Sequence, residues 1–294
     1  MYNHLILTFR SLISPVLLAS ILILSLLPMV SHAGLHLSKE PLKSKLPPAK
    51  VIPADAAYIP TVLVTGSNRG IGLELVKQFA ANGWNVIGTA RKPAKAKALN
   101  ALAADNDNVA VVQLDVTNAD SIAAMAKTLE GQPIDVLLNN AGVYGNKEKQ
   151  NFDTLDADEF NFVINVNALG PMKVSQALLP NIRAGQQKKI LAMGSGLGSM
   201  AIGGRRGGSY WYKMSKSALH MGMLAMRSEL KDEGIIVQLI APGIVQTDLL
   251  RASTDKDMGI PAAASVEGLL RVVDSITMKT RNKMINYNGA TLPW

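Results

Sequence analysis

Residues 62–75 read VLVTGSNRGIGLEL, and this stretch decides the fold. An apolar run ends at Thr65, glycine-rich sequence follows, and an apolar pattern of helical spacing begins at once. Glycine permits a sharp turn and a close approach to the backbone, and the N–H groups that open a helix attract phosphate. The order strand, glycine turn and helix therefore predicts a βα unit with a phosphate-binding loop. The predicted loop residues are Gly66, Asn68, Arg69, Gly70, Ile71 and Gly72.

The same alternation continues to the end of the chain. Nearly continuous apolar runs occupy 61–65, 85–90, 109–114, 134–139, 189–193 and 235–241, with a shorter run at 283–287 before a turn at Asn288-Gly289. Helical patterns occupy 72–82, 94–104, 121–129, 156–184 and 212–233. Continuous apolar runs are typical of strands that are covered on both faces. The alternation therefore predicts right-handed βαβ units in a doubly wound (Rossmann) parallel sheet of the α/β class, in a single domain over residues 60–294.

The composition argues against several classes of site. The chain has no cysteine, which excludes disulfides, cysteine-ligated zinc and thiol nucleophiles. Only His220 of the four histidines lies beyond residue 59, so we expect neither a metal centre nor a Ser-His-Asp triad. The net charge is +8, but the basic residues are not clustered in long runs. That pattern favours a small anionic ligand over nucleic acid.

The first 34 residues form an N-terminal hydrophobic leader. Arg10 precedes an apolar stretch at 16–27, and Pro28 precedes a small-x-small pattern at 31–33, as in a cleaved signal peptide. Residues 11–30 are alternatively long enough for an uncleaved membrane anchor. The lysines after this span, at 39, 43, 45 and 50, would then favour a domain on the cytoplasmic face. Signal peptide and anchor both remain open.

Residues 35–59 are rich in proline and lysine and lack periodicity. Such a composition predicts a tether that is semi-extended where the prolines cluster. The domain is accordingly expected to begin near Ile59.

Further motifs follow the predicted strands in order. A helical asparagine, Asn167, precedes the fifth strand, and Ser195 follows it; a Tyr-x-x-x-Lys pair comes next at Tyr212 and Lys216. The remaining motif residues are Asp115 and Val116 after the third strand, Asn139, Asn140, Ala141 and Gly142 after the fourth, and Pro242, Gly243, Val245 and Thr247 after the sixth. Together with Thr-Gly-x-x-x-Gly-x-Gly at 65–72, this series resembles the short-chain dehydrogenase/reductase family over residues 60–294.

The resemblance implies an oxidoreductase with a nicotinamide dinucleotide cofactor. It implies that Asn167, Ser195, Tyr212 and Lys216 are catalytic, with Lys216 also holding the nicotinamide ribose and Asn167 holding a proton-relaying water. The implied cofactor-binding residues outside the glycine loop are Arg91, Asp115, Val116, Asn139, Ala141, Gly142, Tyr212, Lys216, Pro242, Gly243, Val245 and Thr247. The ending MINYNGATLPW looks most like the C-factor/sniffer-type carbonyl reductase branch, which implies an open pocket for aldehydes and ketones.

The Tyr-Lys pair also carries an argument from chemistry alone. Tyr212 and Lys216 are neighbours on one helical face. A tyrosine with a pKa of about 10 is a poor acid–base group at neutral pH, whereas an adjacent ammonium favours the phenolate. We therefore expect Lys216, together with the positive charge of an oxidised nicotinamide, to lower the pKa of Tyr212. Tyr212 would exchange a proton with a carbonyl or alcohol oxygen that Ser195 holds.

The residues after the second strand indicate which cofactor is preferred. Sheets that prefer NAD carry an acidic residue at this strand end for the ribose 2′-hydroxyl. Here Ala90 takes that place, Arg91 follows, and Arg69 lies in the glycine loop. Two guanidinium groups suit the 2′-phosphate, so we expect NADP(H).

Two local features leave alternatives open. The stretch GLGSMAIGGRRGGSYWY at 196–212 is long and glycine-rich, and Ser199 within it is a second candidate for the role of Ser195. Arg205 and Arg206 either meet an anionic substrate or are solvated loop arginines.

The expected function is an NADPH-dependent carbonyl reductase acting on a small molecule. The alternative is an NADPH-binding sensor or C-factor-like signalling protein with the same fold. An exported domain would lack a supply of NADPH, so the anchor that faces the cytoplasm is favoured over export. The helices at 156–184 and 212–233 could form the homodimer interface of many family members.

Overall fold

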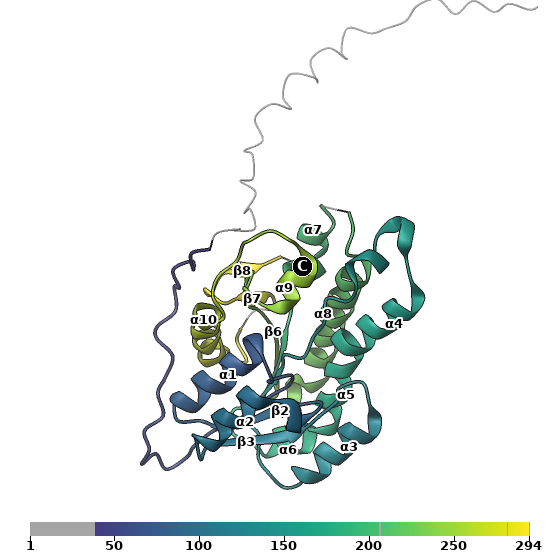
Figure 1. The fold of residues 1–294 in the computed structure, drawn as a ribbon. Helices are drawn as coiled ribbons and strands as arrows, with labels where there is room; N and C mark the ends of the chain where they lie inside the picture. Colours follow the sequence, from purple (N-terminus) through teal and green to yellow (C-terminus); the bar gives the residue numbers. More distant parts are fainter. Residues whose placement is uncertain (1–38, 206, 281, 294) are drawn as a thin grey trace, which may run out of the picture. The chain divides into compact units, whose positions relative to one another are not determined.

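A computed structural model describes residues 39–205, 207–280 and 282–293 (Figure 1). Its centre is an eight-stranded sheet in the order β3-β2-β1-β4-β5-β6-β7-β8, parallel except for β8. The strands are β1 (Thr61–Val64), β2 (Asn85–Ala90), β3 (Val109–Gln113), β4 (Val136–Asn139), β5 (Lys189–Met193), β6 (Ile236–Ala241), β7 (Met284–Asn286) and β8 (Thr291–Leu292). The predicted Rossmann-like α/β fold with a mostly parallel sheet is confirmed.

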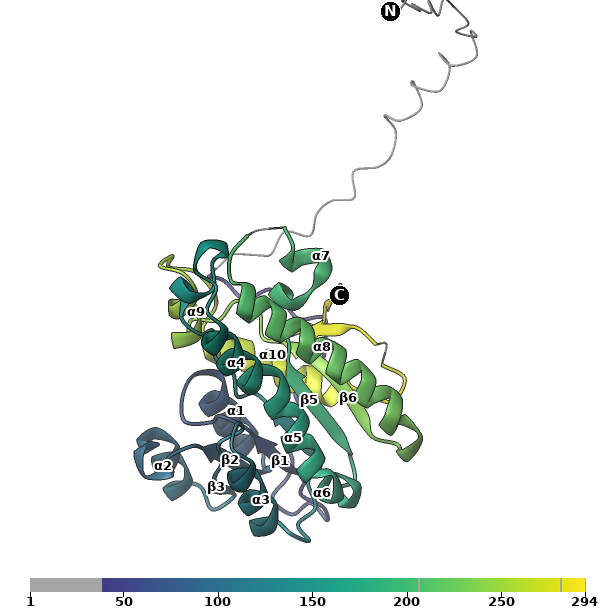
Figure 2. The same cartoon turned by 90° about the vertical axis from the view of Figure 1, so that its right-hand side faces the viewer.

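The alternation of side chains along each strand explains the two apolar layers. In β1, Val62 and Val64 join one buried cluster, whereas Leu63 joins the other. The first cluster is covered by α1 (Gly70–Ala81), α2 (Lys97–Ala104) and α10 (Ala262–Ser275). The second is covered by α3 (Ala119–Thr128), α5 (Gly170–Ala177), α6 (Leu179–Ala184) and α8 (Tyr210–Leu230), which face the viewer in Figure 2. Both faces of the sheet are thus covered, and the central strands are accordingly mostly apolar.

The helix predicted over 156–184 is interrupted in the structure. It consists of α4 (Ala157–Ile164), a π-helical turn η5 (Asn165–Leu169), α5 and α6. The interruption has two physical causes. The Asn167 side chain bonds to the backbone of Val143 outside the helix, and Pro171 follows within the next turn and lacks an N–H group.

The elements that the sequence pattern did not predict lie mainly near the carboxyl end of the chain. They are α7 (Met200–Gly203), α9 (Asp248–Ser253), α10 and β8, together with the short turns η2 (Pro93–Lys95), η3 (Lys147–Lys149), η4 (Phe152–Thr154), η6 (Gly196–Gly198) and η7 (Lys231–Glu233). The helix α10 was predictable, because residues 266, 269, 270 and 273 form a buried stripe of helical spacing.

Residues 39–58 lie against the domain, which differs from the expected tether. In this segment, which we call the strap, Leu42, Leu46 and Ile52 pack against the first apolar cluster. The backbone N–H of Leu42 donates to the Tyr287 hydroxyl at 2.7 Å. Tyr58 at the end of the strap donates to Asp135 Oδ2 at 2.6 Å. Figure 1 shows the strap beside α10 and α1. Apolar side chains between the lysines account for this packing.

The predicted leader at 1–34 lies outside the described residues. Among the helices that the structure does describe, none is long and apolar enough to cross a membrane.

Candidate active site

Two glycines of the glycine loop that leads from β1 into α1, Gly66 and Gly72, have no room for a side chain. Gly66 has φ +68°, and a Cβ on it would lie 2.9 Å from the Cα of Ala141. A Cβ on Gly72 would lie 2.3 Å from the carbonyl oxygen of Gly66. Arg69 occupies the N-cap of α1 in extended backbone, while Asn68, Arg69 and Gly70 are exposed and Ile71 is half-buried. The loop therefore presents backbone N–H groups at a helix start, which suits a phosphate.

The loop after β4 is bonded directly to the glycine loop. Thr65 Oγ1 accepts from the N–H groups of Asn140 and Ala141, both at 3.0 Å, and Asn140 Nδ2 donates to the Thr65 carbonyl at 2.9 Å. Asn139 is buried and donates to Ser175 Oγ at 3.1 Å. A Cβ on Gly142 would lie 3.7 Å from Lys216 Nζ. The loop after β1 and the loop after β4 thus form one continuous surface from Gly66 to Gly142, beside Lys216. We call this surface the floor of the site.

Asp115 and Arg91 interact beside this floor. Burial raises the pKa of the Asp115 carboxyl, but hydrogen bonds from Thr117 and the charge of Arg91 outweigh it and lower the pKa. Thr117 donates its backbone N–H and its hydroxyl to Asp115 Oδ1 at 3.0 and 2.7 Å. Val116 is buried, and Arg91 is exposed directly after β2. The predicted cofactor residues after β2 and β3 are therefore neighbours.

The segment after β6 lies over the glycine loop. A Cβ on Gly70 would lie 3.5 Å from Thr247 Cγ2, and Thr247 caps α9. Val245 is buried and forms an isolated parallel bridge with Ile260. The Pro242 carbonyl accepts from Ser265 Oγ at 2.7 Å. The predicted residues after β1, β4 and β6 thus meet at one edge of the sheet.

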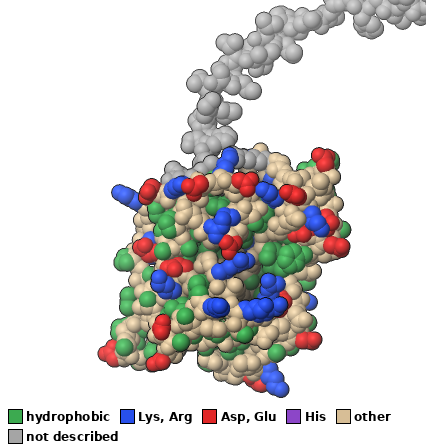
Figure 3. All heavy atoms as spheres, viewed as in Figure 1, with side chains coloured by type: hydrophobic (Ala, Val, Ile, Leu, Met, Phe, Trp, Pro, Cys, Tyr) green, Lys and Arg blue, Asp and Glu red, His purple; other side chains and the backbone are tan. Residues whose placement is uncertain are grey.

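Arg69 has a partner that the sequence did not indicate. Its Nη1 donates to Asp248 Oδ2 at 2.9 Å, and both side chains are largely exposed. Arg91 thus follows β2 directly, and Arg69 in the glycine loop is bonded to α9 through Asp248. Figure 3 shows Lys and Arg side chains gathered between α9 and β2 on this face.

The four predicted catalytic residues come together at the amino-terminal half of α8. Tyr212 and Lys216 are buried on that helix, and Lys216 Nζ lies 5.8 Å from the centroid of the Tyr212 ring. Lys216 Nζ donates to the Met193 carbonyl at 2.9 Å. Ser195, two residues beyond Met193, forms a side-chain hydrogen bond with Tyr212.

The pKa of Tyr212 differs from the expectation. Burial raises it to about 12, and this effect exceeds the lowering by the hydrogen bond with Ser195. Nearby Tyr144 raises the pKa further. The predicted lowering was wrong for the protein's own groups. Burial removes the charged phenolate from water, and this raises the pKa by more than the neighbouring groups lower it. Tyr212 therefore holds its proton at neutral pH.

Burial also lowers the pKa of two further side chains of α8, Lys216 and His220. It lowers the pKa of Lys216 to about 8. The pKa of His220 falls to about 4, through burial and then through the charge of Lys216. Neutral His220 accepts from the backbone N–H of Ser195 through Nε2 at 3.3 Å. His220 thus helps to hold the turn that carries Ser195, a role that its sequence context did not reveal.

Asn167 supports the site from η5. Its Oδ1 accepts from the Val143 N–H at 2.8 Å, and its Nδ2 donates to the Val143 carbonyl at 2.8 Å and to Ser215 Oγ at 3.0 Å. Ser215 Oγ donates in turn to the Tyr212 carbonyl at 2.8 Å. Asn167 therefore connects the floor of the site with α8.

The structure distinguishes the two serine candidates, Ser195 and Ser199. Ser199 caps α7, where its hydroxyl accepts from the Ile202 N–H at 3.3 Å. It is Ser195 that contacts Tyr212. Arg205 donates to the Ala201 carbonyl at 3.0 Å and is exposed, whereas Arg206 lies outside the described residues.

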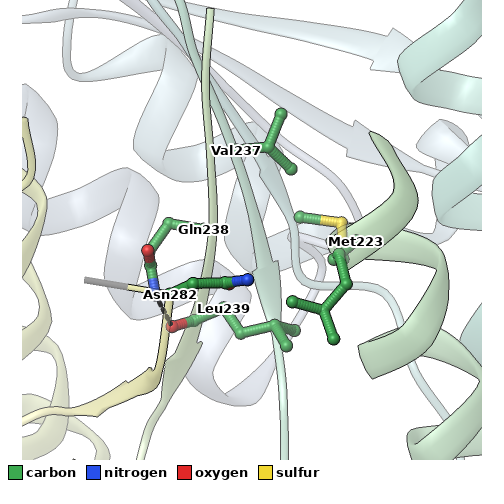
Figure 4. A pocket seen from close by; sticks show the side chains of 6 residues that line it. Met223, Val237, Gln238, Leu239 and Asn282 are labelled. Atoms are coloured by element: carbon green, nitrogen blue, oxygen red, sulfur yellow. Dashed lines mark hydrogen bonds between the residues drawn. The ribbon is translucent and has the colours of Figure 1, made fainter. Parts of the chain in front are cut away.

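One hollow lies apart from this group of residues. A small hollow between α8 and β6, lined by Met223, Val237, Leu239, Gln238 and Asn282, lacks charged or nucleophilic groups (Figure 4). Among the described residues, no cluster of His, Asp and Glu could hold a metal ion.

Comparison with known proteins agrees with this arrangement. The sequence matches the short chain dehydrogenase family over residues 60–258. The chain belongs to this family. Within it, the short-chain dehydrogenase described here is 38% identical over 162 residues to the C-signal protein of Myxococcus xanthus, covering 55% of this chain and 93% of the relative.

Two solved carbonyl reductases are similar to this short-chain dehydrogenase in structure. One is the NADPH-bound enzyme from chicken fatty liver, with a TM-score of 0.74, 29% identity, and coverage of 81% of this chain and 96% of that one. The other is Sniffer of Drosophila melanogaster, with a TM-score of 0.72, 27% identity, and coverage of 81% and 100%. The predicted branch of the family is thus confirmed.

Proposed function

We propose that this short-chain dehydrogenase is an NADPH-dependent carbonyl reductase in which Tyr212 is the proton donor. The observation that carries the proposal is the group formed by half-buried Ser195 with buried Tyr212 and Lys216, beside the glycine loop. A phenol with its proton, a hydroxyl and an ammonium meet there at the end of the floor that Gly142 completes.

The residues present fit NADPH. The glycine loop is a cradle in which a Cβ on Gly72 would meet backbone atoms, and it opens at the start of a twelve-residue helix. Ala90 takes the position where an acidic residue would favour the 2′-hydroxyl, and Arg91, which follows it, suits a 2′-phosphate. The NADPH bound by the chicken relative supports the same choice. When bound, this cofactor supplies the hydride for the carbonyl carbon.

The protein's own residues then handle the oxygen and the proton. Ser195 holds the carbonyl oxygen by a hydrogen bond, in the place where it contacts the Tyr212 hydroxyl. Tyr212 gives its proton to that oxygen as negative charge develops on it. Lys216, held by the Met193 carbonyl, lies near the ring and stabilises the phenolate that remains. The raised pKa of Tyr212 keeps the phenol protonated at neutral pH, so the proton that reduction needs is present.

The test is NADPH consumption by the purified full-length chain on a panel of aldehydes, ketones and quinones. We expect turnover with NADPH, weaker turnover with NADH, and a loss of about a hundredfold or more in Tyr212→Phe, because general acid catalysis contributes about 10²–10⁴-fold. The control is Tyr287→Phe, since Tyr287 lies at the strap. Equal turnover by the Tyr212→Phe and wild-type proteins would remove Tyr212 from the mechanism.

The similarity to C-signal supports a second candidate, a protein that binds NADPH and acts as a signal. Retention of Tyr212, Lys216 and Ser195 in contact favours catalysis. Tight NADPH binding without reduction of any panel compound would favour the signalling role.

Location and assembly stay predictions. The apolar stretch within residues 1–34 supports membrane attachment with the domain facing the cytoplasm, with export as the alternative. A homodimer through α4, α5 and α8 stays a prediction from helix length.

A further inference from the structure

Gln150 is a polar side chain at 0% exposure whose amide groups are all hydrogen-bonded. Its Oε1 accepts from the backbone N–H of Tyr212 at 3.1 Å. Its Nε2 donates to the carbonyls of Tyr144 and Asn146 at 3.0 and 3.3 Å. Its own carbonyl accepts from the N–H of Tyr210 at 3.1 Å. Gln150 thus joins the loop after β4 to the first turn of α8.

The first turn of α8 needs this support. The leading N–H groups of a helix have no partner within the helix. Ser209, at the N-cap, has a left-handed backbone with φ +57°, and its hydroxyl pairs with the Tyr144 hydroxyl instead of the helix. Gln150 therefore supplies, from 62 residues away, the cap that the local sequence does not.

Two neighbours of Gln150 fix the same turn. Trp211 Nε1 donates to the Lys149 carbonyl at 2.9 Å. The Tyr144 ring lies 5.1 Å from the Tyr212 ring, centroid to centroid. Residues 144–150 continue the chain from Gly142, which lies beside Lys216. The floor of the site and the first turn of α8 are therefore connected through this short segment.

We infer that Gln150 is a positioning residue that fixes the Tyr212 hydroxyl relative to the reacting carbonyl; this rests on the proposed reductase function. Tyr212 is the third residue of α8, so the backbone that Gln150 holds is the one that carries the phenol. A displacement of about 1 Å at a reacting group can cost about a hundredfold in rate. Gln150 acts through Tyr212 and not on the substrate.

The experiment compares Gln150→Met with Asn151→Ala in the full-length chain. Methionine keeps the approximate volume but removes the bonds to Tyr212, Tyr144 and Asn146. Asn151 is the matched control, because its side chain donates to the Lys147 carbonyl within the same loop and is exposed. The readouts are kcat and KM for a reduced carbonyl, the NADPH Kd by fluorescence, and amide hydrogen exchange over residues 208–214.

We expect Gln150→Met to lower kcat by about tenfold or more, by the sensitivity of rate to alignment. KM and the NADPH Kd should stay within about twofold, because none of the bonds of Gln150 involves the glycine loop. Exchange over 208–214 should accelerate, and Asn151→Ala should match the wild type in all readouts. A soluble Gln150→Met protein with wild-type kcat would overturn the inference, and so would a rise in KM or Kd alone.

A milder variant covers the case in which Gln150→Met does not fold. Gln150→Asn stays polar but is one carbon too short to reach Tyr212 N, and the same fall in kcat is expected. If the wild-type chain reduces no carbonyl, the proposed reductase function is wrong. Amide hydrogen exchange then still tests whether Gln150 holds the first turn of α8. Unchanged exchange over 208–214 in both variants would show that Gln150 does not hold α8.

Discussion

At the scale of the residue, the burial of Tyr212 and Lys216 sets the pH range of the reaction. Burial raises the pKa of Tyr212 to about 12, so its proton is present wherever the protein is folded near neutrality. Burial lowers the pKa of Lys216 to about 8, so its positive charge is present below that pH and is lost above it. The lysine, and not the tyrosine, therefore limits reduction on the alkaline side.

This predicts a fall in kcat/KM for NADPH-dependent reduction above about pH 8, with a plateau between about pH 6 and 7.5. The profile of kcat/KM reports groups of the free enzyme, to which these pKa values belong. Arginine stays charged at all these pH values. The Lys216→Arg protein should therefore show no fall in kcat/KM near pH 8, whatever its absolute rate. A wild-type profile that stays flat to pH 10 would contradict the assignment to Lys216.

The sequence predicted which residues meet at this site but not the sign of the main pKa shift. Tyr212 and Lys216 are four residues apart on a helix, so their proximity follows from helical geometry. The pKa of Tyr212 depends on burial under Tyr144 and neighbouring elements, which spacing does not show. Gln150 could not be predicted either, because its role arises from a contact between a loop and a distant helix.

At the scale of the element, the helical pattern over 156–184 predicted helix but not its interruption. The apolar residues continue at near-helical spacing on both sides of the π-helical turn at Asn165–Leu169, so the pattern alone predicted one helix. Asn167 and Pro171 were the available signals, since a buried amide and a missing N–H group both disturb a regular helix.

The strap leads to a prediction about stability. Leu42 and Leu46 are half-buried against the first apolar cluster, and a Cβ on Gly289 would lie 2.9 Å from Leu46 Cγ. The double substitution Leu42→Ala, Leu46→Ala should lower the free energy of unfolding by about 2 kcal/mol, since half-buried leucines lose less than fully buried ones. The measurement is the urea midpoint of the full-length chain.

Val51→Ala is the matched control for the strap. Val51 lies in the same segment but is 65% exposed, so its loss should change stability by less than about 0.5 kcal/mol. Equal effects of the control and the double variant would mean that the strap does not stabilise the domain.

At the scale of the whole molecule, the alternation of strands and helices predicted the sheet because both of its faces are buried. Each central strand carries apolar residues to both clusters, and the crossover rule then leaves few topologies. The packing of the strap and the strand β8 could not be predicted from this alternation. Their short segments are stabilised by contacts with the finished domain and have little periodicity of their own.

Cofactor binding links the site to the stability of the whole domain. The predicted cofactor residues come from the ends of β1, β2, β3, β4 and β6, so a ligand that bridges them should stabilise the domain as a unit. A ligand at about 100 times its Kd adds about 2.7 kcal/mol to the free energy of unfolding. For a domain of this size that corresponds to a rise in Tm of about 5–10 °C.

We therefore expect NADPH to raise the Tm by about this amount and NADH, at the same concentration, to raise it less. Arg91→Ala should remove most of the difference between the two cofactors, because Arg91 is exposed directly after β2, where the ribose 2′-substituent is recognised in such sheets. Arg69→Ala should have a smaller effect, since Arg69 is paired with Asp248. Arg183→Ala is the control, because Arg183 pairs with Glu233 away from these strand ends. Equal shifts with NADPH and NADH in the wild-type chain would mean that Arg91 does not select the 2′-phosphate.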